Sequence, residues 1–161
     1  MRRSESERAI DLAYKAVARR DLTVAELRAR LERKHVSPEA IDDAVAELEE
    51  TGFLDDARYA RQFAEDKREL DQWGTDRIAQ DLRRRGIAPQ LIEAAVSTHD
   101  RDSELRTALL LLRKRYREAP GNDRERDRAW QMLVRRGYSP ELAYDAIRNW
   151  ERAERQRRRA A

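Results

Sequence analysis

The sequence repeats itself at an interval of 51 residues, and no other feature constrains the fold as strongly. Residues 31–41, 82–92 and 133–143 align at this offset without a gap. The matching positions hold proline, then alanine, then Val or Ile: Pro38, Pro89, Pro140; Ala44, Ala95, Ala146; Val45, Val96, Ile147. Self-similarity at a fixed period is the signature of a repeat architecture. The sequence therefore predicts three copies of one structural unit.

Each copy contains a turn between two helices. Gly86 and Gly137 follow the first of these helices, where a residue with positive φ is needed, and His35 takes that place in the first copy. The following proline suits the first position of the next helix, and Ser37 and Ser139 are placed to cap it. Since a side chain in the left-handed region costs up to ~1 kcal/mol, we expect the turn at His35 to be looser or differently shaped.

A third helix is expected before each helix pair, over about residues 5–18, 56–70 and 103–116. In the last of these, large side chains recur on one helical face: Leu105, Leu109, Leu112 and Tyr116. Thr23 and Glu26 have the spacing of a capping box. No segment alternates with a period of two, as a strand does. The predicted architecture is all-α, with three tandem three-helix units in an elongated, solenoid-like arrangement.

The composition and the repeat together set the expected domains. Apolar residues make up 40% of the chain but include 24 alanines, so several thin cores are expected rather than one thick core. The predicted units span residues 1–52, 53–100 and 101–150. Residues 151–161 form an arginine-rich C-terminal tail that is expected to extend the last helix and to fray.

Several classes of protein are excluded by what the sequence lacks. Without cysteine, and with His35 and His99 as the two histidines, it offers no disulfides, no thiolate zinc site and no cysteine nucleophile. The five glycines are scattered singly and form no phosphate-cradling loop. No apolar run approaches the ~18 residues of a membrane span, and no signal peptide is recognisable. We therefore expect a cytoplasmic, non-enzymatic protein with no catalytic, cofactor-binding or metal site and no membrane contact.

Basic residues recur at the end of the first helix of each pair. The repeated positions are Arg33 and Lys34, Arg84 and Arg85, and Arg135 and Arg136, with Arg83 added in the second unit. One interpretation is that they complement the helix dipole, at ~0.3–1 kcal/mol each. The other is a row of cations that follows phosphates or an acidic protein groove. Arginine provides 31 of the 35 basic residues, which suits bidentate contacts or reflects the base composition of the gene. The sequence decides neither whether the repeated cations serve the helix dipole or a partner, nor why arginine is preferred to lysine.

Aromatic and acidic residues yield four further expectations. The aromatic residues expected at the surface are Trp73, Trp150, Tyr138 and Tyr144. We expect Trp73 to be a staple packed on the neighbouring unit, because base stacking needs rows of aromatic residues and the chain is only 6% aromatic. Asp55 is placed to cap the helix that follows, and Asp56 adds favourable charge to its first turn.

Residues 52–60, Gly-Phe-Leu-Asp-Asp-Ala-Arg-Tyr-Ala, followed by Arg68 and by spaced residues from Gly74 to Ile87, resemble the RecX family of RecA regulators. The resemblance covers about residues 5–150. The motif positions, expected to be mainly structural, are Gly52, Leu54, Asp55, Asp56, Tyr59, Ala60, Arg68 and Gly74. His35 and the arginine-rich tail depart from the family pattern.

The resemblance implies a small bacterial cytoplasmic protein without catalytic activity or cofactor. Such a protein binds RecA and the RecA–DNA filament, within the helical groove of the filament. It restrains strand exchange, ATP hydrolysis and the coprotease activity that triggers the SOS response. It also binds single- and double-stranded DNA weakly on its own, and is expected to be a monomer. The sites expected to bind DNA or the filament are the repeated cations, with Arg83, Arg84 and Arg85 at their centre.

The alternative is a helical DNA-binding or scaffold protein unrelated to RecA. A transcriptional DNA binder of this kind needs base-reading residues at the start of a recognition helix. Here the corresponding helices start with Pro38-Glu39, Pro89-Gln90 and Pro140-Glu141. Two of these three starts are acidic and would face phosphate poorly, which argues against reading of the DNA groove.

Overall fold

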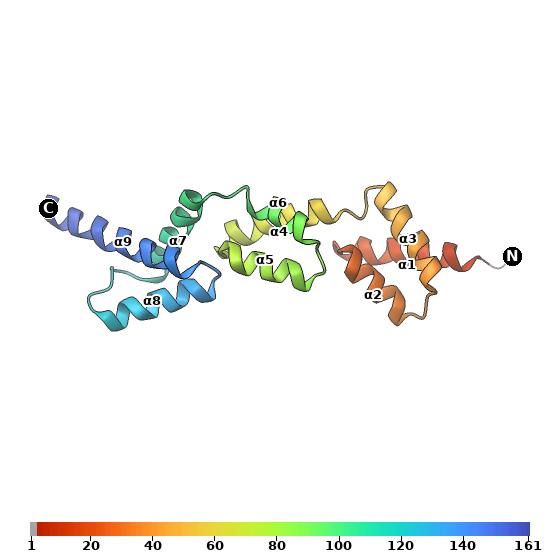
Figure 1. Cartoon of the computed structure of the whole chain (residues 1–161), viewed down its shortest axis with the longest axis horizontal. Coiled ribbons are helices and arrows are strands. Elements are labelled where there is room, and N and C mark those ends of the chain that lie inside the picture. The colour runs from red at the N-terminus through yellow and green to blue at the C-terminus, as the bar shows by residue number, and fades with distance from the viewer. Residues whose placement is uncertain (1–2) are drawn as a thin grey trace. The chain divides into compact units, whose positions relative to one another are not determined.

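A computed structural model describes residues 3–161, which form nine α-helices and no strand. The helices are α1 (Glu5–Arg19), α2 (Val24–Arg33), α3 (Pro38–Glu50), α4 (Asp56–Asp71), α5 (Thr75–Arg84), α6 (Pro89–Val96), α7 (Arg101–Arg115), α8 (Asp123–Arg135) and α9 (Pro140–Ala160) (Figure 1). The prediction of an all-α chain with three successive sets of three helices is confirmed. The elongated arrangement of these sets stays a prediction.

The helix boundaries follow the sequence signals closely. The first helix of each set, α1, α4 and α7, begins within two residues of the predicted start. The basic tail extends α9 to Ala160, as expected. No helix among the described residues combines the length and apolar character that crossing a bilayer demands.

The described chain divides into two compact units. The first contains the described residues up to Gln62 together with Asp81–Ala95, and the second contains Phe63–Gln80 together with Val96–Ala161. Helices α4 and α5 of the middle repeat therefore contribute to both units, while each outer repeat lies within one unit.

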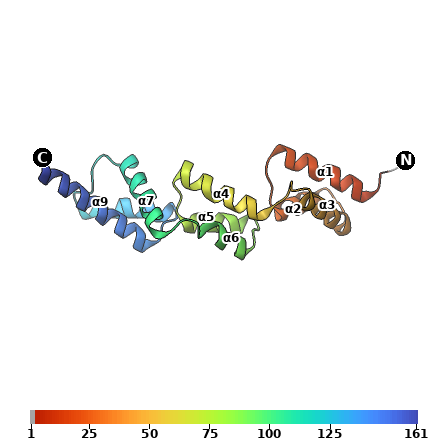
Figure 2. The same ribbon diagram turned by 90° about the horizontal axis from the view of Figure 1, so that it is seen from above.

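In the first unit, α1 lies across α2 and α3 (Figure 2). The buried side of α1 is a ridge of alanines, Ala9, Ala13 and Ala16, because small side chains let this helix approach α3 closely. The larger apolar residues of α1 are partly buried around this ridge: Ile10, Leu12, Tyr14 and Val17. Helices α2 and α3 fill the core with residues such as Leu27, Leu31 and Leu48.

In the second unit, α7, α8 and α9 enclose a core that includes two aromatic residues expected at the surface. Tyr138 is only 1% exposed and Trp150 only 5%, so the prediction for both is wrong, whereas Tyr144 is 50% exposed as expected. Tyr138 directly follows the turn glycine, at the position that Val36 and Ile87 fill in the other repeats. Both of those side chains are also buried.

The ring of Trp73 contacts side chains of its own repeat, and its packing as a staple on a neighbouring repeat stays a prediction. Its ring contacts Phe63 edge-on, with the two centroids 6.3 Å apart. The side chains of Lys67 and Arg77 lie over the indole, at 4.7 and 3.9 Å from its centroid. The indole thus contacts side chains of both α4 and α5 beside the connection between these two helices.

The turn at His35 has the same shape as the two glycine turns, so the expectation of a different shape is wrong. His35 has φ 59°, Gly86 has φ 80° and Gly137 has φ 99°. The residue after each turn donates to the same carbonyl position: Val36 to Leu31, Ile87 to Leu82 and Tyr138 to Leu133, at 3.1–3.2 Å. The hydrogen bonds and packing of the first repeat therefore hold a histidine in the left-handed region.

The predicted helix caps are present, with one difference. The Ser37 hydroxyl accepts a hydrogen bond from the amide of Ala40 at 3.4 Å, and the Ser139 hydroxyl accepts one from the amide of Leu142 at 3.2 Å. Thr23 likewise accepts from the amide of Glu26 at 3.1 Å. The carboxylate of Glu26 does not complete a capping box, because it faces the guanidinium groups of Arg20 and Arg85.

Candidate nucleic-acid interface

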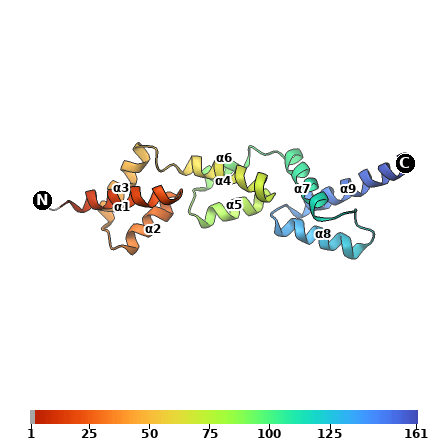
Figure 3. The same cartoon turned by 180° about the vertical axis from the view of Figure 1, so that it is seen from behind.

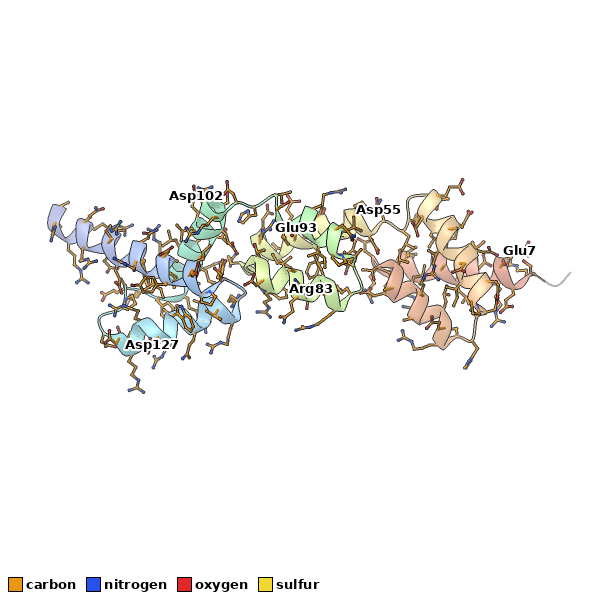
Figure 4. All side chains as sticks on the ribbon, viewed as in Figure 1. Glu7, Asp55, Arg83, Glu93, Asp102 and Asp127 are labelled. Carbon is orange, nitrogen blue, oxygen red and sulfur yellow. The ribbon has the colours of Figure 1, made fainter. Side chains whose placement is uncertain are left out.

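The repeated cations end α2, α5 and α8, but their side chains lie in two different environments. Five are exposed: Arg33, Lys34, Arg83, Arg84 and Arg135. Figure 4 places Arg83 on α5. The other two, Arg85 and Arg136, are half-buried and contact other parts of the protein. The structure thus separates outward-facing cations from cations that hold the fold together.

Arg85 is surrounded by polar groups of the first unit. Its Nη1 donates to the Tyr59 hydroxyl at 2.7 Å, and its Nε donates to Asp81 at 3.4 Å. A carboxylate oxygen of Glu26 lies 3.6 Å from Nη1. Burial lowers the pKa of Arg85, but Tyr59 and Asp81 outweigh it and raise this pKa above its ordinary value. Because the guanidinium is engaged on several sides, Arg85 is less available to a phosphate than Arg83 or Arg84.

The backbone of Arg85 belongs to what we call the first joint, formed by Thr23, Val24, Asp56, Arg85 and Gly86. The buried Thr23 hydroxyl donates to the Arg85 carbonyl at 2.6 Å. The next amide, of Val24, donates to Oδ1 of Asp56 at 2.9 Å. A Cβ on Gly86 would lie 2.3 Å from the Cβ of Ala25, so this turn must be glycine to approach α2. The joint ties the first repeat to the turn of the second.

A second joint occurs 51 residues later, formed by Gly74, Thr75, Glu104, Arg136 and Gly137. The amide of Gly74 donates to the Arg136 carbonyl at 2.8 Å, and the Thr75 amide donates to Oε1 of Glu104 at 2.9 Å. A Cβ on Gly74 would lie 2.4 Å from the carbonyl carbon of Gly137. The positions of Thr23, Val24 and Arg85 are thus occupied in the second joint by Gly74, Thr75 and Arg136.

The Arg136 and Tyr138 side chains reinforce the second joint. Nη1 of Arg136 donates to the carbonyl of Asp71 at 2.8 Å, and the Tyr138 hydroxyl donates to the carbonyl of Gln72 at 2.7 Å. Asp71 is the last residue of α4, and Gln72 follows it with a positive φ of 50°. Burial raises the pKa of Tyr138 well above its ordinary value.

The motif residues before α4 and in its first turn cap or position that helix. Oδ1 of Asp55 accepts the amide of Arg58 at 3.0 Å, which confirms the predicted cap (Figure 4). Gly52 ends α3 with φ 79°, and Leu54 is buried in the core of the first repeat. Asp56 was predicted only to add favourable charge at the start of the helix, but its carboxylate also accepts a hydrogen bond from the Val24 amide. Burial raises the pKa of Asp56, although that amide opposes the shift.

The motif residues deeper in α4 are also held by the protein. Ala60 is fully buried, and Tyr59 accepts the hydrogen bond from Arg85. Arg68 is buried, and its Nη2 donates to the carbonyl of Val96 at 2.9 Å, at the end of α6. Burial lowers the pKa of Arg68, while the charges of Glu104 and Tyr138 act in the opposite direction. No group of three or more His, Asp or Glu side chains within residues 3–161 is placed to hold a metal ion.

Sequence reasoning found the cations but missed both joints. The signal was available in part, since Val24 and Thr75, like Arg85 and Arg136, are related by the 51-residue offset. The donors differ, however, because a side-chain hydroxyl in one joint is replaced by a main-chain amide in the other. The acidic partners, Asp56 and Glu104, do not share the offset.

Comparison with known proteins identifies the family. Three family models match in order along the chain: the first three-helix domain of RecX at residues 9–48, the second at 55–96 and the third at 102–147. The regulatory protein RecX of Deinococcus radiodurans is 37% identical over 150 residues, covering 91% of this chain and 70% of the relative. That of Trichlorobacter lovleyi is 34% identical over 134 residues, covering 81% of this chain and 87% of the relative.

Solved structures show the same fold. The crystal structure of RecX from Lactobacillus salivarius matches with a TM-score of 0.82 at 17% sequence identity, over 91% of this chain and 97% of that one. A second crystal structure, of a regulatory protein RecX, matches with a TM-score of 0.75 at 22% identity. With all three domains matched in order and substantial identity to curated relatives over most of their length, this chain belongs to the RecX family of regulatory proteins.

Proposed function

We propose that this protein is a non-enzymatic regulator that binds RecA and the RecA filament on DNA as a monomer. It inhibits the recombinase, ATPase and coprotease activities of RecA and thereby modulates DNA repair and the SOS response. Family membership supports this proposal, because the relatives are named regulatory proteins RecX. The observation that carries it is the set of exposed cations that recurs at the turns of the three repeats.

The joints give these cations a defined backbone. Arg83 and Arg84 lie in the last turn of α5, directly before the carbonyl of Arg85 that accepts the Thr23 hydrogen bond. Arg135 likewise precedes Arg136, whose carbonyl accepts from Gly74. Cations on a fixed backbone lose less conformational entropy when they bind, and phosphates or carboxylates are their natural ligands. We therefore assign the contact with DNA and the filament mainly to Arg33, Lys34, Arg83, Arg84 and Arg135.

Several modest contacts of this kind add up on a repetitive partner. Once one repeat is bound, the others contact a filament at a high effective concentration, so that weak sites yield a strong overall affinity. Phosphate contacts also release counterions, and binding should therefore weaken as salt rises. Neither property requires a pocket or a catalytic group.

The direct test is the DNA-dependent ATP hydrolysis of RecA, measured with the purified full-length protein. We expect wild type to slow hydrolysis and the Arg83→Ala/Arg84→Ala variant to slow it less. Arg8→Ala/Arg61→Ala is the matched control, because both residues are exposed arginines outside the repeated positions and their removal deletes the same charge. A wild-type protein without effect on RecA would refute the function. Equal behaviour of the two double variants would refute the role given to Arg83 and Arg84.

A further inference from the structure

The third repeat carries a cleft at the start of α8 that the functional assignment above does not use. It has a volume of about 590 Å³ and lies among the α7–α8 connection, α8 and α9. A neighbouring hollow of about 450 Å³ shares five lining residues with it: Tyr116, Arg117, Trp150, Glu154 and Arg158. We call the two together the third-repeat cleft. Figure 3 shows the α7–α8 connection extending away from α7 before the chain turns back into α8.

The position of the cleft is informative because of the repeat. In the first two repeats, the N-terminal end of the second helix receives the turn of the following repeat, through Thr23 and Gly74. The third-repeat cleft lies at the corresponding end of α8, and within the described residues no further turn is seated there. A second copy of the chain would bring its own first turn, with Arg33 and Lys34, against a surface rich in arginine. Charge therefore disfavours a second copy as the occupant.

Three of the four side-chain carboxylates that line the cleft accept hydrogen bonds within the protein, and the fourth, Glu118, is exposed. Glu154 accepts the amide of Ala119 at 2.8 Å, and Glu125 accepts the amide of Gly121 at 2.7 Å. Glu151 accepts from Nε of Arg126, also at 2.8 Å. The first two bonds fasten the α7–α8 connection. The seven arginines that line the cleft outnumber its four side-chain carboxylates, so its lining is positively charged.

Arginines without an acidic partner remain around the cleft. Those that line it and form no ion pair among the described residues are Arg113, Arg117, Arg128, Arg155 and Arg157. They come from α7, the connection, α8 and α9, so four segments contribute arginines to the two hollows of the cleft. Every member is an arginine, whose planar guanidinium binds phosphate in a bidentate manner. Unpaired cations of one kind around one cleft indicate an anionic ligand.

The floor of the cleft is aromatic. The rings of Tyr116 and Trp150 have centroids 6.2 Å apart and are tilted by 37°. Trp150 is almost fully buried, whereas Tyr116 is half-buried and presents part of its ring to the cleft. Ala119 and Pro120 add apolar surface beside them. An aromatic floor below a rim of guanidinium groups is the arrangement that binds single-stranded nucleic acid, with a base on the ring and phosphates on the cations.

We propose that the third-repeat cleft binds a short stretch of single-stranded nucleic acid, with its phosphates on the unpaired arginines and a base against Tyr116. This site goes beyond the contact assigned to Arg83 and Arg84, and it shares no residue with it. An acidic polypeptide satisfies the arginines equally well but offers no planar ring to the aromatic floor, so we favour nucleic acid.

The first test measures binding of a labelled oligothymidylate of about twelve nucleotides to the full-length protein by fluorescence anisotropy. We expect Arg117→Gln/Arg155→Gln to raise the Kd about tenfold. The slope of log Kd against log salt should also fall by about 0.7 per lost phosphate contact. Arg124→Gln/Arg152→Gln removes the same charge from exposed positions on α8 and α9 outside the cleft. Equal affinities of the two double variants would overturn the proposal.

A second test addresses the aromatic floor. Tyr116→Leu removes the ring and should weaken oligothymidylate binding, while Tyr116→Phe keeps the ring and should bind like wild type. Thermal melting of each variant establishes that the third repeat is folded. Loss of binding in Tyr116→Phe, or none in a folded Tyr116→Leu, would exclude base stacking. Displacement of the oligonucleotide by equimolar polyglutamate would assign the cleft to an acidic polypeptide instead.

The two proposals fail separately. If wild type does not slow ATP hydrolysis by RecA, the proposed regulatory function is refuted, but the oligothymidylate experiment still tests the cleft. If the two double variants of the third repeat bind oligothymidylate equally well, the proposed site in the cleft is refuted. The assay with Arg83→Ala/Arg84→Ala then still tests the regulatory function.

Discussion

The hydroxyl of Thr23 donates a 2.6 Å hydrogen bond to the backbone carbonyl of Arg85, 62 residues away. The same hydroxyl caps α2 by accepting the amide of Glu26. One buried side chain thus caps the start of a helix in the first repeat and binds the turn of the second. In the other compact unit, the main-chain amide of Gly74 binds the corresponding carbonyl of Arg136 directly.

Replacing Thr23 by Val should lower the free energy of unfolding by about 1–3 kcal/mol. The change keeps the shape of the side chain but removes both hydrogen bonds, leaving a buried carbonyl and a helix amide without partners. Thr51→Val is the matched control, because the Thr51 hydroxyl also donates to a carbonyl, that of Glu47, but lies at an exposed position where water replaces the lost bond. Its removal should cost less than about 0.5 kcal/mol. Urea unfolding followed by circular dichroism measures both. Equal losses would show that the first joint adds no stability.

Gly86→Ala should destabilise the protein much more than Gly52→Ala. Both glycines have φ near 80°, so each substitution carries a backbone cost of about 1 kcal/mol. Only at Gly86 does the new methyl group collide with a neighbour, the Cβ of Ala25 at 2.3 Å, whereas Gly52 has open space around it. Overpacking adds about 1–3 kcal/mol. Thermal melts compare the two variants, and similar melting temperatures would mean that the turn moves away from α2 at little cost.

Arg85→Ala and Arg83→Ala should separate stability from binding. Loss of the bonds from Arg85 to Tyr59 and Asp81 is expected to cost about 1–3 kcal/mol. Arg83 is exposed, so its removal should stay within about 0.5 kcal/mol of wild type while weakening DNA binding. Denaturant titration and DNA anisotropy on the same preparations provide the comparison. A stable Arg85→Ala variant with impaired DNA binding would reverse the assignment made above.

The stability contributed by Asp56 should fall as pH rises. Burial is the main cause that raises its pKa in the folded protein above the ordinary 3.8. The folded chain therefore holds this proton more tightly than the unfolded chain, and the contribution is full below pH 3.8 and is lost as pH rises through the higher folded value.

Asp56→Asn tests this directly. It removes the titration and keeps an oxygen for the amide of Val24. The free energy of unfolding of the variant, relative to that of wild type, should thus increase as the pH is raised from about 3 to about 7. Urea unfolding across that range measures the difference, with Asp127→Asn on the exposed face of α8 as the control. A difference that stays constant with pH would contradict the prediction.

The sequence was most informative where local rules decide the structure. Proline at the first helical position and serine before it fixed the starts of α3 and α9 within a residue, and Gly137 supported the start of α9. The alternation of these signals at one period also predicted three-helix repeats. Asp55 was recognised as a cap for the same reason, because capping depends on a residue and the three that follow it.

Rules based on neighbouring residues did not predict features that depend on tertiary packing. The cost of a side chain in the left-handed region suggested a different turn at His35, but the burial of Val36 and its bond to Leu31 hold His35 in the same conformation as the glycines. Tyr138 and Trp150 were expected at the surface, but they lie in a core with leucines, a methionine and an isoleucine contributed by α7, α8 and α9. The bond from Thr23 to Arg85 joins positions too far apart for any spacing rule.

The difference between the two joints limits how the repeats can be exchanged or multiplied. Threonine in place of Gly74 would drive its Cβ to within 2.4 Å of Gly137, and glycine in place of Thr23 would delete the hydroxyl that the first joint needs. Neither donor can therefore replace the other without a steric clash or the loss of a hydrogen bond. The three units share an ancestry visible in the sequence, yet each has become specific to its own place in the chain.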